Sequence, residues 1–216
     1  MTNRGAFITF EGTEGSGKTT QFRLLIERAR KAGFTVVETV EPGGTKIGQH
    51  IRRILLDPAN NEMGSTAELL LYFAARAQNV DQCVGPALAR NDVVICDRWT
   101  DSTWAYQGAG RNLGTALVEQ LDAIACRGLK PHVTIYLDID LEIGLHRART
   151  RNQRTQLNES RLDDETLVFH QRVRNAYMEL AQRDAARFRV IDAGRPIEEV
   201  AAAIWSAVFP IIEATR

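Results

Sequence analysis

Residues Gly12–Thr19 follow the pattern Gly-x-x-x-x-Gly-Lys-Thr, which is typical of a loop that binds nucleotide phosphates. The loop comes directly after a short apolar run, Ala6–Phe10, and opens a helical stretch at Thr19. Glycines let backbone amides turn toward phosphate oxygens, and the helix N-terminus adds partial positive charge. Lys18 is then expected to reach the β- and γ-phosphates, and the Thr19 hydroxyl to bind Mg²⁺. We predict that the chain binds a nucleoside triphosphate.

A second polar set follows the apolar run Val93–Cys96. Asp97 stands where that strand would end, which suits a carboxylate that contacts Mg²⁺ through the waters around the ion. If a helix follows, polar side chains four residues apart fall in neighbouring rows of one face. They are Arg98, Ser102 and Tyr106 in one row and Thr103 and Gln107 in the next. A cation with hydroxyl and amide groups could bind the phosphate and sugar or base of an acceptor, although Asp97 and Arg98 alone could also form a structural ion pair.

Two other features are ambiguous by themselves. Tyr72 and Arg76 lie four residues apart on a predicted helix and would suit a base ring with carbonyl acceptors, but this spacing is also common at a core edge. A polar segment, Asn152–Ser160, is flanked by arginines and resembles the tip of a lid. A lid could bring guanidinium groups onto a transferred phosphoryl group, whereas charge runs are usually just solvated. The arginines around it are Arg147, Arg149, Arg151, Arg154 and Arg161.

Short apolar runs alternate with longer helical patterns along the chain. The predicted strands are Ala6–Phe10, Thr35–Val40, Val93–Cys96, Val133–Leu137 and Phe188–Ile191. The predicted helices are Thr19–Ala32, Ile47–Leu56, Thr66–Arg90, Thr115–Arg127, Leu141–Arg151, Thr166–Ala186 and Ile197–Phe209. This alternation predicts an α/β fold, a parallel sheet with helices on both faces. We expect one domain over residues 1–216, with a short lid at about 147–162.

Composition excludes several classes of protein. The 216 residues are 44% hydrophobic and 25% charged, which is typical of a globular chain. The formal net charge is zero, so we expect no nucleic-acid partner. Neither a signal-peptide core nor a membrane span is evident, and the three cysteines show no paired spacing, so we expect a cytoplasmic protein. No N/TKxD motif occurs, which argues against a switch GTPase, and the length fits a small kinase.

At this point the chain resembles thymidylate kinase of the bacterial type over essentially its whole length. The P-loop is shared by many families, but this set of motifs in this order is specific. The motifs are Phe10–Thr20, Glu41–Thr45, Ile51–Arg52, Tyr72–Arg76, Asp97–Arg98, Asp101–Gly108, Arg161–Glu165 and Ile191–Gly194. The resemblance implies a P-loop nucleoside monophosphate kinase fold with five parallel strands, a homodimer, and transfer of the γ-phosphoryl group of ATP to dTMP with Mg²⁺.

The resemblance also implies roles for individual residues. Those that would bind ATP are Gly12, Thr13, Glu14, Gly15, Ser16, Gly17, Lys18, Thr19, Thr20, Arg147, Asp192, Ala193 and Gly194. Those that would bind dTMP are Glu14, Arg52, Tyr72, Arg76, Arg98, Ser102, Thr103, Tyr106 and Gln107. Lys18, Arg98 and Arg161 would be catalytic, and Thr19 and Asp97 would face the metal.

Within that scheme, Arg98 would hold the dTMP phosphate with Arg52 nearby, and Tyr72 would stack on thymine while Arg76 donates to its O4. Glu14 would face the sugar 3′-hydroxyl or the magnesium shell. Gly15 fits the subtype that lacks a P-loop arginine and takes the catalytic cation from the lid.

The chain departs from the family pattern at Trp99, Val40 and Ser160. We expect Trp99 to change packing rather than chemistry.

Three alternatives remain open from the sequence. One is another nucleoside monophosphate kinase. A second is a nucleoside kinase with a hydroxyl acceptor, which would need a base such as Glu11. The third is a regulatory protein that binds a triphosphate without turnover.

Overall fold

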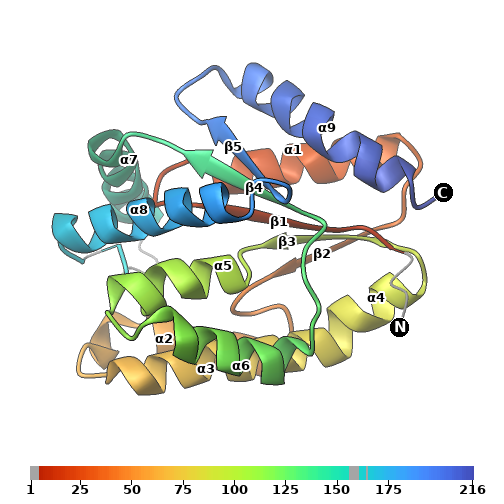
Figure 1. Ribbon diagram of the computed structural model, residues 1–216. Helices are drawn as coiled ribbons and strands as arrows, with labels where there is room; N and C mark the ends of the chain where they lie inside the picture. The colour runs from red at the N-terminus through yellow and green to blue at the C-terminus, as the bar shows by residue number, and fades with distance from the viewer. Residues whose placement is uncertain (1–4, 156–160, 164) are drawn as a thin grey trace.

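The computed structural model describes residues 5–155, 161–163 and 165–216. All five predicted strands are present, each within two residues of its expected bounds. They are β1 (Phe7–Gly12), β2 (Val36–Val40), β3 (Val93–Asp97), β4 (Val133–Asp138) and β5 (Phe188–Asp192). All are parallel and form one sheet in the order β2-β3-β1-β4-β5. The predicted five-stranded parallel sheet is confirmed (Figure 1).

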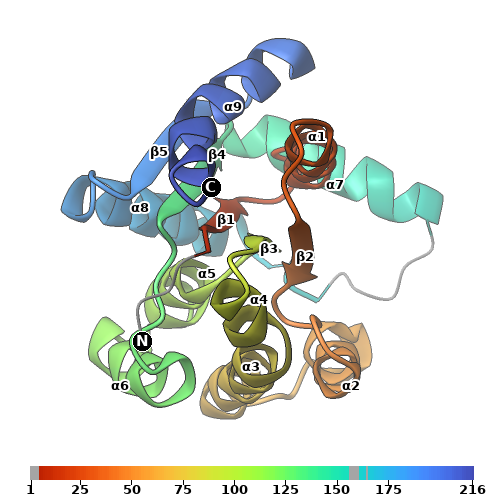
Figure 2. The same ribbon diagram turned by 90° about the vertical axis from the view of Figure 1, so that its right-hand side faces the viewer.

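Helices cover both faces of this sheet (Figure 2). The α-helices are α1 (Lys18–Lys31), α2 (Lys46–Leu56), α3 (Ser65–Asn79), α4 (Gly85–Ala89), α5 (Thr100–Thr103), α6 (Thr115–Cys126), α7 (Leu141–Thr155), α8 (Leu167–Arg183) and α9 (Ile197–Glu213). A short 3₁₀ turn spans Pro58–Asn60, and π-helical turns span Val80–Val84 and Trp104–Gly110. Among the described residues, no helix has the length and apolar character that crossing a bilayer requires.

Two hydrophobic cores lie on opposite faces of the sheet because successive strand residues point to opposite sides. On β3, Val94 and Cys96 pack into the core formed with α3, α6 and α8. Val93 and Ile95 pack into the other core, formed with α1 and α9. The strands are therefore buried on both faces, which explains their nearly continuous apolar runs.

The sheet register brings the predicted functional segments together. Phe10 of β1 lies beside Asp97 of β3, so the phosphate-binding loop and the Asp97–Arg98 pair emerge at the same edge. This edge is formed by the carboxyl ends of the strands, where parallel α/β sheets bind ligands.

Three predicted helices differ from the structure by four residues or more. One is the last, predicted over Ile197–Phe209, which continues as α9 to Glu213 with Pro210 inside it. The stretch Thr66–Arg90 is interrupted by the π-turn Val80–Val84, which directly precedes Pro86. A proline ring and its missing N–H do not fit the preceding α-helical turn, and the wider π-turn accommodates it. The end predicted for the helix Leu141–Arg151 was also wrong, because α7 continues to Thr155. Residues 152–155 contain no glycine or proline that would end the helix. Residues 156–160 of the predicted lid tip lie outside the described part of the chain.

Candidate active site

The turn between β1 and α1 carries the predicted phosphate-binding sequence. Gly17 caps α1 in the left-handed conformation, with φ at 84°. The Nζ atom of Lys18 donates to the carbonyl oxygens of Gly12, at 2.9 Å, and Thr13, at 3.3 Å. Burial and the nearby charge of Arg98 lower the pKa of Lys18 to about 8. A phosphate bound in this loop would contact both the Lys18 amine and the N-terminus of α1.

Gly15 fits tightly against the first turn of α7. Its φ is 69°, and a Cβ added there would lie 2.0 Å from the carbonyl oxygen of Gly144. A Cβ added to Gly144 would lie 2.5 Å from the carbonyl oxygen of Glu14. The loop therefore has no space for a side chain at position 15.

Thr19 and Asp97 have the character expected of residues near a nucleotide-bound magnesium ion. Thr19 is exposed in the first turn of α1, and Asp97 is half-buried at the end of β3; both line the cavity that contains Lys18. The Oδ1 atom of Asp97 is buried and has no hydrogen-bond partner among the described residues. Mg²⁺ bound to nucleotide phosphates keeps several waters and needs only one or two protein oxygens. The residues present fit this ion.

Arg98 follows β3 with a left-handed backbone, φ 71°, and precedes the helix that begins at Thr100. Its guanidinium donates to the hydroxyls of Ser102 at 3.0 Å, Tyr106 at 3.3 Å and Tyr177 at 3.4 Å. The structure thus brings Arg98, Ser102 and Tyr106 together as expected, although not as one face of a regular helix. The Arg98 side chain stays 22% exposed, which leaves its charge available to an anion in the cavity.

Glu11 is fully buried and orders the groups around this guanidinium. Its Oε1 accepts from the backbone N–H of Trp99 at 2.7 Å, and its Oε2 accepts from the hydroxyls of Ser102 at 2.5 Å and Tyr177 at 2.8 Å. Burial, helped by the charge of Asp101, raises the pKa of Glu11 to about 7. Glu11 does not line the cavity, and its oxygens bind Trp99, Ser102 and Tyr177, so it supports the site and does not contact an acceptor.

Glu14 brings a carboxylate to the same cavity from the phosphate-binding loop. Its Oε1 accepts from the Tyr106 hydroxyl at 2.5 Å and lies 3.5 Å from a guanidinium nitrogen of Arg98. Burial raises the pKa of Glu14, but His170, the charges of Arg98 and Lys18, and the Tyr106 hydroxyl outweigh it and lower the pKa to about 2. Glu14 is therefore ionised at neutral pH and can only accept hydrogen bonds.

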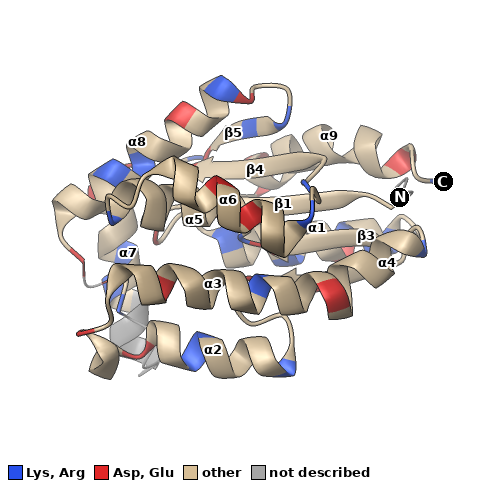
Figure 3. Cartoon of the chain, turned by 60° about the horizontal axis from the view of Figure 1, so that its bottom comes forward, with Lys and Arg blue, Asp and Glu red and all other residues tan. Residues whose placement is uncertain are grey.

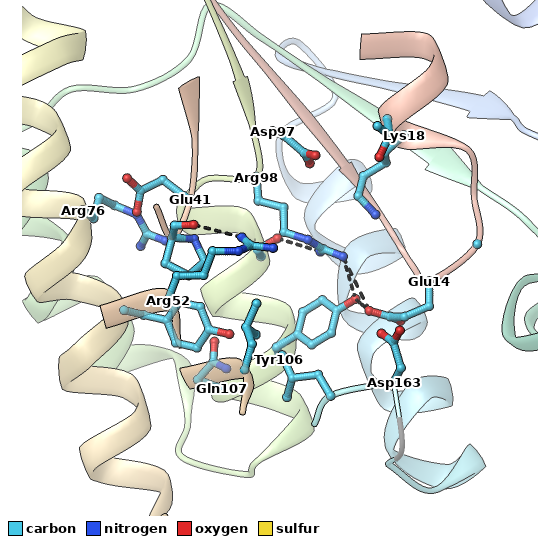
Figure 4. Close-up of a pocket in the computed structure, with 17 residues that line it drawn as sticks. Glu14, Lys18, Glu41, Arg52, Arg76, Asp97, Arg98, Tyr106, Gln107 and Asp163 are labelled. Atoms are coloured by element: carbon cyan, nitrogen blue, oxygen red, sulfur yellow. Dashed lines mark hydrogen bonds and ion pairs between the residues drawn. The ribbon is translucent and has the colours of Figure 1, made fainter. Parts of the chain in front are cut away.

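A single cavity of about 400 Å³ connects these groups. Figure 4 shows Lys18 and Arg76 on opposite sides, with the Arg98 guanidinium between them. The lining residues are Glu14, Gly15, Lys18, Thr19, Glu41, Pro42, Arg52, Leu56, Tyr72, Arg76, Asp97, Arg98, Ser102, Tyr106, Gln107, Leu162 and Asp163. The cavity thus joins a triphosphate cradle, an anion-binding guanidinium and a third, more enclosed region.

Arg76 dominates that third region and is 1% exposed. One of its terminal nitrogens donates to the Thr103 hydroxyl at 2.9 Å and to the carbonyl oxygen of Trp99 at 3.3 Å. The other, NH1, has no hydrogen-bond partner among the described residues. The Arg76 Nε lies 3.7 Å from Oε2 of Glu41, whose pKa burial raises to about 7 despite the charge of Arg76 and a hydrogen bond from Asn79. The Nε atom also makes no hydrogen bond among the described residues, but it faces Glu41, so NH1 is the nitrogen left for a ligand.

Tyr72 and Gln107 complete the enclosed region. Tyr72 is 8% exposed, and burial raises the pKa of its hydroxyl to about 12, so it stays neutral. The amide of Gln107 donates to Oε1 of Glu68 at 2.8 Å. An aromatic ring, a fixed amide and an unsatisfied guanidinium nitrogen are groups that can recognise a planar base with carbonyl oxygens.

Comparison with known proteins agrees with this site. Residues 10–204 match the family model described as thymidylate kinase. The chain belongs to the thymidylate kinase family. Its members are phosphotransferases, and the P-loop nucleoside monophosphate kinase fold expected from the sequence is the fold observed.

Individual relatives match this chain over nearly its full length. It is 50% identical to a thymidylate kinase of Geotalea uraniireducens, covering 94% of this chain and 96% of the relative. It is 48% identical to a thymidylate kinase of Deinococcus radiodurans, covering 95% and 97%. The crystal structure of thymidylate kinase from Ehrlichia chaffeensis superposes with a TM-score of 0.76 at 30% identity, covering 94% of this chain and 98% of that one.

Several residues assigned from the thymidylate kinase resemblance lie outside the cavity. Thr103 does not line it but binds Arg76. Arg161 is 8% exposed and lies against Glu68, with 2.7 Å between the charged atoms, while its Nε donates to the backbone of Leu55. The catalytic role of Arg161 stays a prediction, and it requires this guanidinium to leave Glu68.

The residues assigned to adenine are also separate from the cavity. Arg147 is exposed on α7, and the loop after β5 is held by hydrogen bonds from Ala193 to the Asp138 carbonyl and from Gly194 to the Asp192 side chain. Arg151 and Arg154 lie outside the residues whose side chains the structure describes, as does Ser160. The adenine contacts remain predictions.

Sequence reasoning missed five residues of the cavity wall. They are Glu41, Pro42, Leu56, Leu162 and Asp163. Glu41–Thr45 and Arg161–Glu165 stood out as family motifs, so a signal existed, but no chemistry had been assigned to Glu41 or Asp163. Trp99, one of the departures from the family pattern, is 1% exposed and packs edge-on against Phe7, with 5.0 Å between the ring centres.

Proposed function

We propose that this chain transfers the γ-phosphoryl group of ATP to dTMP, giving dTDP and ADP for the synthesis of dTTP. The observation that carries the proposal is the continuity of one cavity from Lys18, through Arg98, to the free nitrogen of Arg76. Such a cavity can hold, one after another along its length, a phosphate donor, an acceptor phosphate and a base with a carbonyl group.

The acceptor phosphate would bind to Arg98, with Arg52 at the cavity wall beside it. A phosphate monoester has its second pKa near 6 and is largely a dianion at neutral pH. The attacking oxygen therefore needs no general base. Catalysis would consist of positioning the two phosphates and neutralising charge, with Lys18 on the donor side and Arg98 on the acceptor side.

Base selection would come from the enclosed end of the cavity. Tyr72 would stack on thymine, and the unpartnered NH1 of Arg76 would donate to its O4. Cytosine carries an amino group at that position, so two donors would face each other. Gln107 would contact the base directly, and Thr103 would act through Arg76. Tyr106 would occupy the space of a ribose 2′-hydroxyl.

ATP would bind with its phosphates along residues 12–20, and Mg²⁺ would be held by Thr19 and Asp97. When bound, the ion neutralises charge on the phosphates. The buried, unpartnered oxygen of Asp97 supports this assignment. Arg147 and the loop Asp192–Gly194 would flank adenine, and Arg161 would reach the transferred phosphoryl group.

We further propose a homodimer that uses the outer face of α2, α3 and α6. In Figure 3, α2 lies beside α3 and α3 beside α6. Large apolar side chains are exposed on all three. They are Ile47, Ile54, Leu70 and Ile124, between 46% and 74% exposed.

Three free cysteines suit a reducing cytoplasm, and zero net charge gives no reason to expect a nucleic-acid partner.

An acceptor panel tests the proposed reaction. ADP release would be measured with Mg-ATP and dTMP, dUMP, dCMP, UMP, AMP or thymidine. We expect strong turnover with dTMP, weaker turnover with dUMP and little with the others. Turnover of thymidine in place of dTMP would assign a hydroxyl acceptor, and ATP binding without any turnover would favour a regulatory protein.

A further inference from the structure

His170 lies at the active site although nothing in the sequence singled it out. It stands in the first turn of α8, and its side chain is fully buried. The Nδ1 atom is 3.3 Å from Oε2 of Glu14, a residue of the phosphate-binding loop 156 positions away along the chain. The ring packs edge-on against Phe169, with 5.6 Å between the ring centres.

The Nδ1 atom of the imidazole faces the Glu14 carboxylate but makes no aligned hydrogen bond with it. Neither ring nitrogen has an aligned hydrogen bond among the described residues, and Oε2 of Glu14 is likewise without one. A buried imidazole with unmade hydrogen bonds costs about 1–3 kcal/mol, whereas a phenylalanine at this position would cost nothing of this kind. The polar ring therefore needs an explanation that apolar packing does not supply.

The carboxylate of Glu14 supplies one. The final torsion of a glutamate side chain is broad, so a single hydrogen bond leaves the plane of the carboxylate free to rotate. Tyr106 donates to Oε1 from the π-turn at 2.5 Å, and His170 faces Oε2 from α8. The π-turn and α8 pack against each other. The groups that face the two carboxylate oxygens therefore come from two elements in direct contact.

We propose that His170 is a positioning residue that carries its proton on Nδ1 and fixes the plane of the Glu14 carboxylate, so that this carboxylate can accept a hydrogen bond from the 3′-hydroxyl of the acceptor sugar. The inference rests on the proposed function and, of the two roles that the family resemblance implies for Glu14, takes the contact with the sugar 3′-hydroxyl and not the one with the magnesium shell. His170 itself touches neither nucleotide; it sets the preference of Glu14 for an acceptor with a 3′-hydroxyl.

The test compares two acceptors in matched variants. The acceptors are dTMP and its 3′-deoxy analogue, and the variants are His170→Phe, His170→Asn and Val173→Ala. Phenylalanine keeps the ring but removes the donor, and asparagine places an amide N–H near the Nδ1 position. Val173 is equally buried in the same helix and has no polar atom, so its variant controls for loosened packing.

We expect His170→Phe to lower kcat/KM for dTMP about tenfold, mainly through KM, and to leave the 3′-deoxy analogue within about twofold. His170→Asn should restore most of the preference, and Val173→Ala should leave it unchanged. Equal losses on both acceptors, or no rescue by asparagine, would overturn the inference. A wild-type protein that does not phosphorylate dTMP would instead defeat the proposed function.

A measurement on the wild-type protein removes any dependence on variant folding. Nitrogen-15 NMR of the imidazole reports which ring nitrogen carries the proton. A proton on Nδ1 of His170 supports donation to Glu14. A neutral ring with its proton on Nε2 would place two acceptors face to face and overturn the inference.

Discussion

Replacing Arg76 by methionine tests base selection most directly. The change keeps much of the side-chain volume but removes the guanidinium, including the NH1 nitrogen left for a ligand. A hydrogen bond from a charged donor contributes about 1.5–3 kcal/mol, so kcat/KM for dTMP should fall between about 10- and 150-fold. The value for dCMP should fall less, because its amino group gains nothing from Arg76. The dTMP-to-dCMP ratio of kcat/KM is therefore the quantity to measure.

The same substitution should make stability depend on pH in a defined direction. In the wild type the buried Glu41 has a pKa of about 7, above the ordinary 4.5, even with Arg76 beside it. Without Arg76 the folded-state pKa rises further. A raised carboxyl pKa favours the protonated folded state, so stability is lost as pH increases above the unfolded value. Arg76→Met should lower the free energy of unfolding more at pH 8 than at pH 5.5, by at most about 3–5 kcal/mol.

The double variant Glu41→Gln/Arg76→Met separates the two effects. It removes the buried acid along with its partner, so denaturant unfolding should show recovered stability at pH 8. The dTMP-to-dCMP ratio should remain low, because the donor to the base is still missing. If Arg76→Met is folded and keeps the wild-type ratio within about twofold, then Arg76 does not recognise the base, and the reasoning is refuted.

Three other perturbations probe the donor side. Because the pKa of Lys18 is lowered to about 8, its charge is present below that pH and lost above it; kcat/KM for ATP should fall above about pH 8, and a flat profile to pH 9.5 would contradict this. Arg161→Ala should lower kcat, measured at saturating substrates, by about 10²-fold or more. Replacement of the exposed Arg149 by alanine is the control and should leave kcat unchanged. An Arg161→Ala enzyme that keeps most of its kcat would show that the catalytic cation was misassigned. Gly144→Ala should raise KM for ATP about tenfold, because the new Cβ would press on the Glu14 carbonyl, whereas Gly64→Ala, with open space around it, should leave KM unchanged.

The sheet could be predicted because its strands are buried on both faces, which leaves a continuous apolar run in the sequence. The strand bounds were harder to predict, because a strand such as β3 ends on a residue that also lines the cavity. β3 ends on Asp97 and not on Cys96, because Asp97 still pairs with Phe10 of β1. Strand order has no such local signal, because it depends on contacts between distant segments.

The sequence pattern predicts Arg98, Ser102 and Tyr106 on one face of a regular helix, whereas the structure brings them together with a different backbone geometry. Arg98, Ser102 and Tyr106 do meet, but through the left-handed backbone of Arg98 and a π-turn at Trp104–Gly110. Neither feature has a periodicity that a helical pattern would reveal. The positions of Arg161 and His170 were unpredictable for a related reason: their partners, Glu68 and Glu14, lie in distant parts of the chain.

The surroundings of Glu11 also distinguish a phosphate acceptor from a hydroxyl acceptor. A kinase that phosphorylates a hydroxyl needs a base in contact with it. Glu11 has a pKa of about 7, which would suit that task, but it lies outside the cavity, and its oxygens already accept from Trp99, Ser102 and Tyr177. What Glu11 does is hold two of the hydroxyls that bind Arg98. The one carboxylate nominated as a base is thus used to orient a cation, and a cation is what a phosphate dianion requires at this point of the cavity.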